Sequence, residues 1–278
     1  MSFGISSLAS SSSGNCYVVR SDNTVILLDV GISLRKIKEY LKFKDLELSQ
    51  IDAVLVTHEH SDHVAGLKAL MNKTDNTGLY LSRGTLNGII DKYEELRGPV
   101  LTYESQERIN IVSADETFVI GDIEVAPFRL SHDTLEPVSY AFSYGGKQIS
   151  VITDTGVVLE DSYQLIKSSD VLVIESNHEP NILMYGSYPY VVKKRILSDH
   201  GHLSNETCAD TVVRFLNDGA FSADYPKVYL AHLSQNNNTP DQAMITMKNV
   251  LEEAGYFIGK DLTVEVLRKD EPSRFIEA

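Results

Sequence analysis

Residues 56–66 read Val-Thr-His-Glu-His-Ser-Asp-His-Val-Ala-Gly and constrain the fold of this chain more than any other stretch. Three imidazoles and two carboxylates fall within positions 58–63. Residues 51–56 are apolar and partly β-branched, and residues 64–71 carry apolar side chains at helical spacing. The pattern predicts a strand, a tight polar loop and the start of a helix. In such a loop four side chains can converge on one small volume: His58, His60, Asp62 and His63. Imidazole nitrogen and carboxylate oxygen suit zinc and similar divalent cations.

Length and composition limit the class of protein. The chain has 278 residues, 42% of them hydrophobic, which suffices for a sizeable core, and we expect one domain over residues 1–278. We find no basic segment followed by an apolar signal-like run, and no stretch near the roughly 18 apolar residues that span a bilayer. The sequence therefore predicts a soluble, cytoplasmic protein with no membrane contact, and it implies no protein partner. The two cysteines, Cys16 and Cys208, read as small buried side chains.

The net charge of −14 argues against a diffuse surface for nucleic acid, because non-specific affinity comes largely from Lys and Arg neutralising phosphates. A local site remains compatible with this charge. Carboxylates that bind metal contribute to the formal negative charge. Two bound divalent cations would offset part of that charge at the place where a phosphate would lie.

The remaining pattern alternates strands and helices. Residues 16–20, 24–30, 78–81, 171–175 and 227–230 read as strands, residues 33–41 and 83–93 as helices, and residues 109–150 as a series of short strands. We also expect a strand at 100–103.

The motif H-x-H-x-D-H directly after a hydrophobic strand resembles the signature of the metallo-β-lactamase fold family, and the resemblance covers nearly the whole chain. It implies an α/β protein of αββα type, in which two mixed β-sheets face each other and helices cover the outside. Each expected ligand ends a strand, so the ligands would meet at one edge of the sandwich.

The resemblance also implies a dinuclear ligand set. One metal would be held by His58, His60 and His132, the other by Asp62, His63 and His232, with Asp154 as the bridge. The cations would be two divalent ions per chain, zinc or manganese, with iron or nickel also open. Asp62 would orient the attacking water or act as base, and Asp29 would support the metal loop. On the residues alone, a lone histidine in a loop such as His132 is more often an ordinary surface residue. The alternative for Asp29 is a carboxylate at the start of the helix at 33–41.

Four further segments resemble the YycJ (WalJ) branch of this family, bacterial proteins regarded as DNA exonucleases: residues 9–15, 175–178, 201–205 and 232–234. The branch implies a phosphodiesterase that digests DNA, of 5′–3′ exonuclease type, through a metal-activated hydroxide. RNA remains open as a substrate. Two other hypotheses are a small-molecule hydrolase, such as a thioesterase or lactamase-like enzyme, and a non-hydrolytic iron-dependent oxidoreductase or metal-held binding module.

Five residues are candidates for contact with the substrate. His202 is expected at a helix start as a catalytic group that donates to a phosphate or to the leaving oxygen; its alternative is a capping or surface residue. The others are expected as substrate-binding residues: Ser13, Asn15, His178 and Asn205. The loop at 9–15 reads equally as a solvated hairpin, and His178 equally as a core histidine. We interpret His200 as a surface residue, and the basic run 193–195 by default as a solvated helix face.

Overall fold

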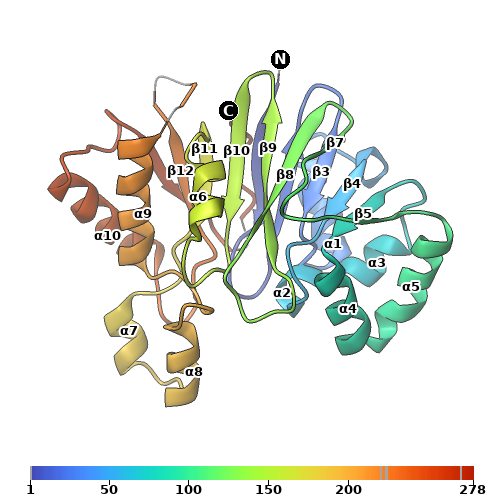
Figure 1. Ribbon diagram of the computed structural model, residues 1–278, viewed down its shortest axis with the longest axis horizontal. Helices are drawn as coiled ribbons and strands as arrows, with labels where there is room; N and C mark the ends of the chain where they lie inside the picture. Colours follow the sequence, from blue (N-terminus) through green and yellow to red (C-terminus); the bar gives the residue numbers. More distant parts are fainter. Residues whose placement is uncertain (1, 220, 223–224, 270) are drawn as a thin grey trace.

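The computed structural model describes residues 2–219, 221–222, 225–269 and 271–278. Two seven-stranded sheets face each other, and helices cover their outer faces (Figure 1). The expected αββα architecture is therefore confirmed. Within the described ranges, no helix has both the length and the apolar character that crossing a membrane requires.

The first sheet is mixed and has the strand order β14-β1-β2-β3-β4-β5-β6. Strands β3 to β6 are parallel to one another, and the remaining pairs are antiparallel. Its strands are β1 (Gly4–Ala9), β2 (Cys16–Arg20), β3 (Val25–Leu28), β4 (Ala53–Leu55), β5 (Gly78–Leu81), β6 (Ile109–Ile111) and β14 (Ile276–Glu277).

The second sheet has the order β13-β12-β11-β10-β9-β8-β7. Strands β10 to β13 are parallel, and β7 to β10 form antiparallel pairs. Its strands are β7 (Phe118–Ile120), β8 (Ile123–Arg129), β9 (Val138–Tyr144), β10 (Lys147–Ile152), β11 (Val171–Glu175), β12 (Lys227–Ala231) and β13 (Thr263–Val266).

Helices follow the strands of both sheets. Those of the first half are α1 (Leu34–Lys42), the 3₁₀ helix η1 (Leu48–Gln50), α2 (Ser61–Val64), α3 (Leu67–Met71), α4 (Arg83–Lys92) and α5 (Glu94–Ser105). Those of the second half are α6 (Glu160–Ile166), α7 (Pro180–Tyr185), α8 (Tyr190–Ile196), α9 (Asn205–Asp218) and α10 (Pro240–Glu253). Helices α7 and α8 project from the lower edge of the sandwich, while α9 and α10 cover the second sheet (Figure 1).

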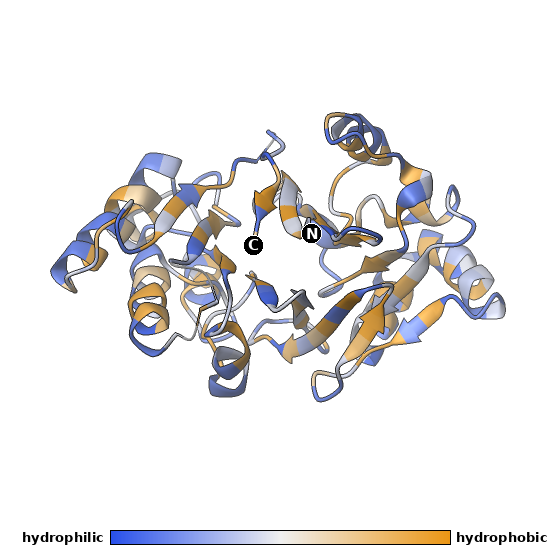
Figure 2. Ribbon diagram, turned by 90° about the horizontal axis from the view of Figure 1, so that it is seen from above, coloured by the Kyte–Doolittle hydropathy of each residue, from blue (hydrophilic) through white to orange (hydrophobic). Residues whose placement is uncertain are grey.

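The core consists of three apolar layers because each sheet buries both faces. Along β2, Tyr17 and Val19 face the other sheet, while Cys16 and Val18 face the helices. This alternation is the two-residue period of a strand. A third layer packs the second sheet against α6, α9 and α10. Figure 2 shows hydrophobic stretches along the strands. Both cysteines are buried, as expected.

The strand expected at 100–103 is wrong, because these residues belong to helix α5. The buried residues of this helix are Leu96, Val100 and Tyr103, at spacings of four and three that place them on one helix face. The Tyr103 ring also packs under the Arg108 guanidinium, 3.6 Å from the ring centroid. A four-residue apolar run fits a strand and a buried helix turn equally well, and tertiary packing decides between them.

Candidate metal centre

The candidate ligands lie where strands end. The histidine-rich loop follows β4, His132 follows β8, Asp154 follows β10 and His232 follows β12. Asp154 and His232 have positive φ angles, 61° and 54°. Such backbone conformations are uncommon outside glycine and cluster at functional sites. Each of the two residues lies within two positions of the last residue of its strand, and so at the edge of the sheet.

One group of ligand atoms belongs to His58, His60 and His132, whose nitrogens lie within 4.8 Å of one another. His132 Nε2 is 3.3 Å from His60 Nδ1. Burial lowers the pKa of all three imidazoles, to about 4 for His60. They are therefore neutral at neutral pH, which is the state that binds a metal. His58 Nε2 is buried and has no hydrogen-bond partner among the described residues.

A second group contains Asp62, His63, Asp154 and His232, again within 4.8 Å. Asp154 Oδ2 lies 3.2 Å from His63 Nε2, and its Oδ1 lies 3.8 Å from His132 Nε2. The carboxylate thus faces both groups, as a bridge must. Although burial opposes the shift, the charge of Asp154 raises the pKa of His232 to about 10. The negative field that raises this pKa would also favour a divalent cation, and His232 would have to be deprotonated to bind it.

Asp29 holds the histidine-rich loop in place through hydrogen bonds to Thr57 and His63. One of its oxygens accepts the Thr57 backbone N–H at 2.9 Å, and the other lies 2.7 Å from His63 Nδ1. Because Nδ1 of His63 donates to Asp29, its Nε2 is left to face the metal site. Asp29 is buried and has a φ of 59°, so the end of β3 repeats the geometry of Asp154 and His232.

Glu175 is a residue of the site to which the sequence reasoning assigned no role. It is fully buried at the end of β11, and its carboxylate lies 2.7 Å from His202 Nδ1 and 2.8 Å from His232 Nδ1. Burial opposes ionisation, but these two histidines lower the pKa of Glu175 to about 2. A signal was present in the sequence, since a carboxylate ends the apolar run 171–174 as Asp29 and Asp154 end theirs.

His202 lies beside the metal ligands and two residues before Ser204, the N-cap of α9. Its Nδ1 is 3.9 Å from Asp154 Oδ1, and together with Asp154, Glu175 and His232 it forms a third group of possible ligand atoms. Burial by itself would lower the pKa of His202. The charges of Glu175 and Asp154 raise this pKa by more than burial lowers it, so the net shift is upward.

Asn15 contacts metal-binding residues. Its Nδ2 lies 3.1 Å from His63 Nε2 and 3.5 Å from Asp62 Oδ2. Its backbone N–H donates to the Asp62 carbonyl at 2.8 Å, and Gly31 fits against the same carbonyl, where an added Cβ would lie 1.7 Å from the oxygen. The loop at 9–15 is therefore packed onto the metal loop, and Asn15 positions ligands.

Three of the expected substrate-binding residues are buried or lie in a separate hollow. The Asn205 amide is buried and bonds to Ser176 and Asn238, so the expectation for Asn205 is corrected: its polar atoms are used inside the protein. His178 is 1% exposed, and neither ring nitrogen has a hydrogen-bond partner among the described residues, so its expected contact with the substrate stays a prediction. Ser13 lines a separate hollow, and its neighbour Ser12 borders the metal centre instead.

A cavity of about 470 Å³ opens onto the metal centre. Its walls include Ser12, Tyr93, Tyr188, Val192, Arg195 and Ile196 beside His60, Asp62, Asp154, His202 and His232. Of the basic run, Arg195 borders this cavity and pairs with Asp133 at 2.9 Å, whereas Lys193 donates to the carbonyl groups of Met184 and Gly186. His200 is exposed, as expected.

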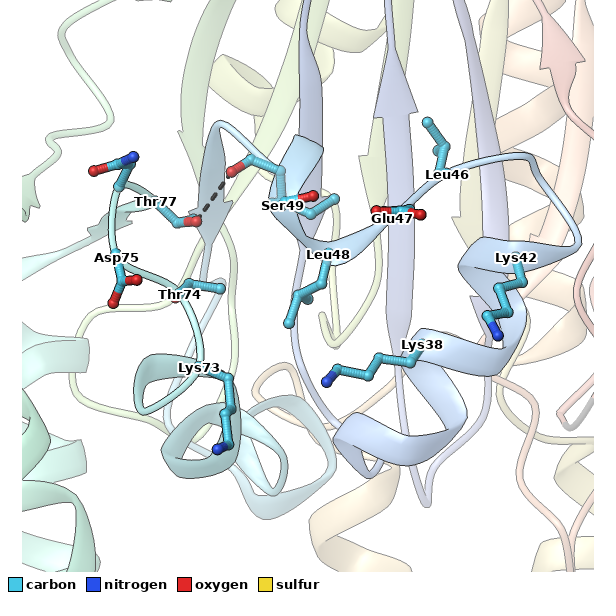
Figure 3. A pocket seen from close by; sticks show the side chains of 12 residues that line it. Lys38, Lys42, Leu46, Glu47, Leu48, Ser49, Lys73, Thr74, Asp75 and Thr77 are labelled. Carbon is cyan, nitrogen blue, oxygen red and sulfur yellow. Dashed lines mark hydrogen bonds between the residues drawn. The ribbon is translucent and has the colours of Figure 1, made fainter.

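Another cavity of about 470 Å³ lies at the opposite ends of β4 and β5 (Figure 3). Ile51 and Thr77, which precede those two strands, are joined there by a 3.0 Å hydrogen bond. Lys38 and Lys42 of α1 and Lys73 surround this cavity, and its lining has no histidine. It therefore offers no ligand set comparable with that at the other edge.

Comparison with known proteins first defines the class. The sequence profile of the Beta-lactamase superfamily domain matches residues 24–218. The metallo-beta-lactamase fold protein YhfI from Bacillus subtilis has 15% identity and a TM-score of 0.67, covering 98% of this chain and 99% of its own. Unliganded yeast PDE1 has 14% identity and a TM-score of 0.72, with the same coverage. At these identities the likeness to the two solved structures concerns the fold alone. The profile match, together with the histidines and aspartates grouped at one edge of the sheets, defines a protein of the metallo-β-lactamase class.

Sequence relatives define the branch. Exodeoxyribonuclease YycJ of Bacillus anthracis is 38% identical over 260 residues, which cover 94% of this chain and 93% of the relative. Exodeoxyribonuclease WalJ of Streptococcus pneumoniae is 37% identical over 262 residues, with the same coverage. The chain belongs to the YycJ/WalJ family within the β-lactamase superfamily, and the resemblance drawn from its motifs is confirmed.

Proposed function

We propose that this protein is a metal-dependent nuclease that hydrolyses phosphodiester bonds at the ends of DNA, in the 5′–3′ direction, with two divalent cations, zinc or manganese. One observation carries the proposal. Buried ligand atoms in both groups lack hydrogen-bond partners among the described residues: His58 Nε2, Asp154 Oδ2 and His232 Nε2. Leaving a buried polar atom unsatisfied costs roughly 1–3 kcal/mol. Three such atoms at one sheet edge therefore indicate that a ligand outside the polypeptide satisfies them.

The donor set fits divalent cations. Imidazoles and carboxylates converge from four strand ends in two groups, and Asp154 of the second group lies 3.8 Å from His132 Nε2 of the first. A pair of cations so held supplies Lewis-acid stabilisation of a phosphoryl oxygen and activates water near neutral pH. The names of the YycJ and WalJ relatives, which are exodeoxyribonucleases, support DNA as the substrate.

The protein's own groups have separable roles in this proposal. Asp62 is partly exposed, and His63 and His232 lower its pKa against the opposing effect of burial. It therefore remains an ionised acceptor that orients the attacking water. His202 is held at Nδ1 by Glu175, and its side chain is 16% exposed in the cavity wall. Its raised pKa favours the protonated form, which donates to a phosphate oxygen or to the leaving oxygen.

The test compares substrates on the metal-loaded protein. We expect cleavage of DNA labelled at its 5′ end and of a simple phosphodiester, bis(p-nitrophenyl) phosphate, but not of nitrocefin or a lactoylglutathione thioester. Labelled RNA and 3′-labelled DNA in parallel determine sugar preference and polarity. Cleavage of the thioester or the lactam without cleavage of any phosphodiester would replace this proposal with the small-molecule hydrolase.

Two variants then locate the chemistry. His58→Ala should lose metal and activity together, because it removes a ligand. His202→Ala should keep both metals and its melting temperature while its rate on DNA falls on the order of 10²–10³-fold, the effect of losing one donor to the transition state. Loss of metal from His202→Ala would instead make His202 a ligand of the second cation.

A further inference from the structure

Glu59 is a buried carboxylate that belongs to neither group of candidate ligands and has no part in the proposed chemistry. It stands between His58 and His60 in the histidine-rich loop and is 0% exposed. Its Oε1 accepts from Lys92 Nζ at 3.1 Å and from the Leu135 backbone N–H at 3.2 Å. A buried carboxylate requires such partners, and these two come from separate segments of the chain.

The two partners lie in elements that surround the first metal group. This name denotes three candidate ligands: His58, His60 and His132. Lys92 is the last residue of helix α4, and Leu135 lies three positions after His132 in the loop between β8 and β9. Glu59 therefore joins the loop that carries His60 to the loop that carries His132. The two imidazoles meet there, with His132 Nε2 3.3 Å from His60 Nδ1.

Helix α4 fits closely against Glu59. Gly88 faces the carboxylate, and a Cβ added to this glycine would lie 2.6 Å from Glu59 Cδ. The Tyr93 hydroxyl, just after the helix, donates to the Glu59 carbonyl at 3.0 Å, so both the side chain and the backbone of residue 59 are held. At the start of the helix the Gly84 N–H donates to the Glu136 carboxylate at 2.6 Å, which ties the β8–β9 loop to α4 a second time.

His60 is the ligand of this group whose position depends most on Glu59. Nδ1 of His58 lies 3.0 Å from the Thr57 hydroxyl, and Nδ1 of His132 lies 3.1 Å from the Gly201 carbonyl, so outer partners orient both rings. The His60 side chain is 24% exposed, and no described residue outside the first metal group forms a hydrogen bond with its ring. The backbone beside residue 59 therefore sets where this imidazole lies.

We propose that Glu59 is a positioning residue of the metal centre. By holding helix α4 and the β8–β9 loop against the histidine-rich loop, it sets the spacing at which His60 and His132 bind one cation. The inference rests on the proposed function only in that the first metal group holds a divalent cation. Stability alone accounts poorly for this carboxylate, because its Oε2 is buried without a hydrogen-bond partner among the described residues, and buried ion pairs generally add little net stability.

The experiment measures metal affinity rather than turnover. Metal-free full-length protein competes with a chromophoric chelator for Zn²⁺, and the binding step that weakens most in His58→Ala is assigned to the first metal group. Glu59→Ala should weaken that step by about 10- to 100-fold, the usual effect of removing an outer partner of metal-binding histidines, and leave the other step unchanged. Glu59→Gln keeps an oxygen that accepts from Lys92 and Leu135, so its affinity should stay close to that of the wild type.

Two further variants separate position from stability. Gly88→Ala retains the carboxylate but fills the space that it occupies, so it should weaken the same step, although alanine normally stabilises a helix interior. It carries the test if Glu59→Ala does not fold. Glu179→Ala is the matched control, because Glu179 is also a buried glutamate but contacts Asn205 and Thr246 rather than the first metal group. Any change in its melting temperature should leave both metal steps as in the wild type.

Three results would overturn the inference. Glu59→Ala, or Gly88→Ala in its place, could leave the step of the first metal group at wild-type affinity, which would make Glu59 a purely structural carboxylate. Glu59→Ala could weaken both steps equally, which would indicate a general disturbance of the site. Glu59→Gln could lose as much affinity as Glu59→Ala, so that charge rather than position would matter. A wild type that shows the expected metal binding but cleaves no phosphodiester would refute the proposed function and leave the role of Glu59 intact.

Discussion

Glu175→Gln should weaken metal binding at the group that contains His232 and leave the group of His58, His60 and His132 nearly unchanged. Glu175 touches His232 and His202 at 2.8 and 2.7 Å, and no contact joins it to His58 or His60. Outer partners of metal-binding histidines typically contribute 10- to 100-fold to metal affinity.

The magnitude follows from the two hydrogen bonds. Each joins an imidazole Nδ1 to a carboxylate whose pKa is about 2, so the acceptor is charged at any ordinary pH. A hydrogen bond to a charged group contributes roughly 1.5–3 kcal/mol, and 1.4 kcal/mol corresponds to tenfold. Glutamine keeps one oxygen but offers an N–H₂ group in place of the other. If Nδ1 of His232 faces the N–H₂ group, the proton of this imidazole must move from Nδ1 to Nε2, the atom that would bind the cation.

The assay is a competition between metal-free protein and a chromophoric chelator, which resolves two binding steps. We expect one step to weaken by about 10- to 100-fold, and the other to stay as in the wild type. Glu179→Gln is the matched control, because Glu179 is also a buried glutamate but contacts Asn205 and Thr246 rather than a candidate ligand.

Two outcomes would refute this reasoning. Unchanged affinity in both steps would show that Glu175 does not orient His232. Complete loss of one metal at saturating concentration would show that Glu175 is itself a ligand, as its place in the third group of possible ligand atoms permits.

Three further predictions concern single residues. Asp154→Ala should lower occupancy at both metal sites, measured as metal content per chain, and full occupancy would remove Asp154 as the bridge. Asp29→Asn should weaken metal binding through His63, about 10-fold or more in the chelator assay, whereas an unchanged Kd would make Asp29 a purely structural carboxylate. Burial lowers the pKa of His178 from 6.5 to about 4, so below pH 6.5 the unfolded chain binds a proton that the folded chain does not, and the free energy of unfolding falls as the pH drops. In the metal-free protein, the free energy of unfolding of His178→Phe relative to the wild type should therefore rise by about 2 kcal/mol between pH 7 and pH 5, measured by denaturant titration. Parallel pH profiles of the two proteins would contradict this prediction.

The sequence by itself determined the elements that local pattern encodes. The loop at 58–63 concentrates four candidate ligands between an apolar run and a helix, and no distant part of the chain is needed to bring them together. The expected strands end at polar residues, and in the structure Asp29, Asp154 and His232 occupy those ends. Strand periodicity and turn residues act over a few positions, so they can be recognised without the fold.

Only the tertiary structure decided which side chains share a contact. Strands β10, β11 and β12 are parallel neighbours, and Glu175 pairs in register with Ala231, one residue before His232. That register places the Glu175 carboxylate against two imidazoles. The same long-range packing buried the Asn205 amide among internal partners and turned Asn15 toward His63 rather than the cavity. Residues 27 to 57 positions apart meet through the order of strands and the packing of loops, which single-sequence periodicity does not specify. Burial then limits the role of a polar group, because most buried donors and acceptors are hydrogen-bonded inside the protein.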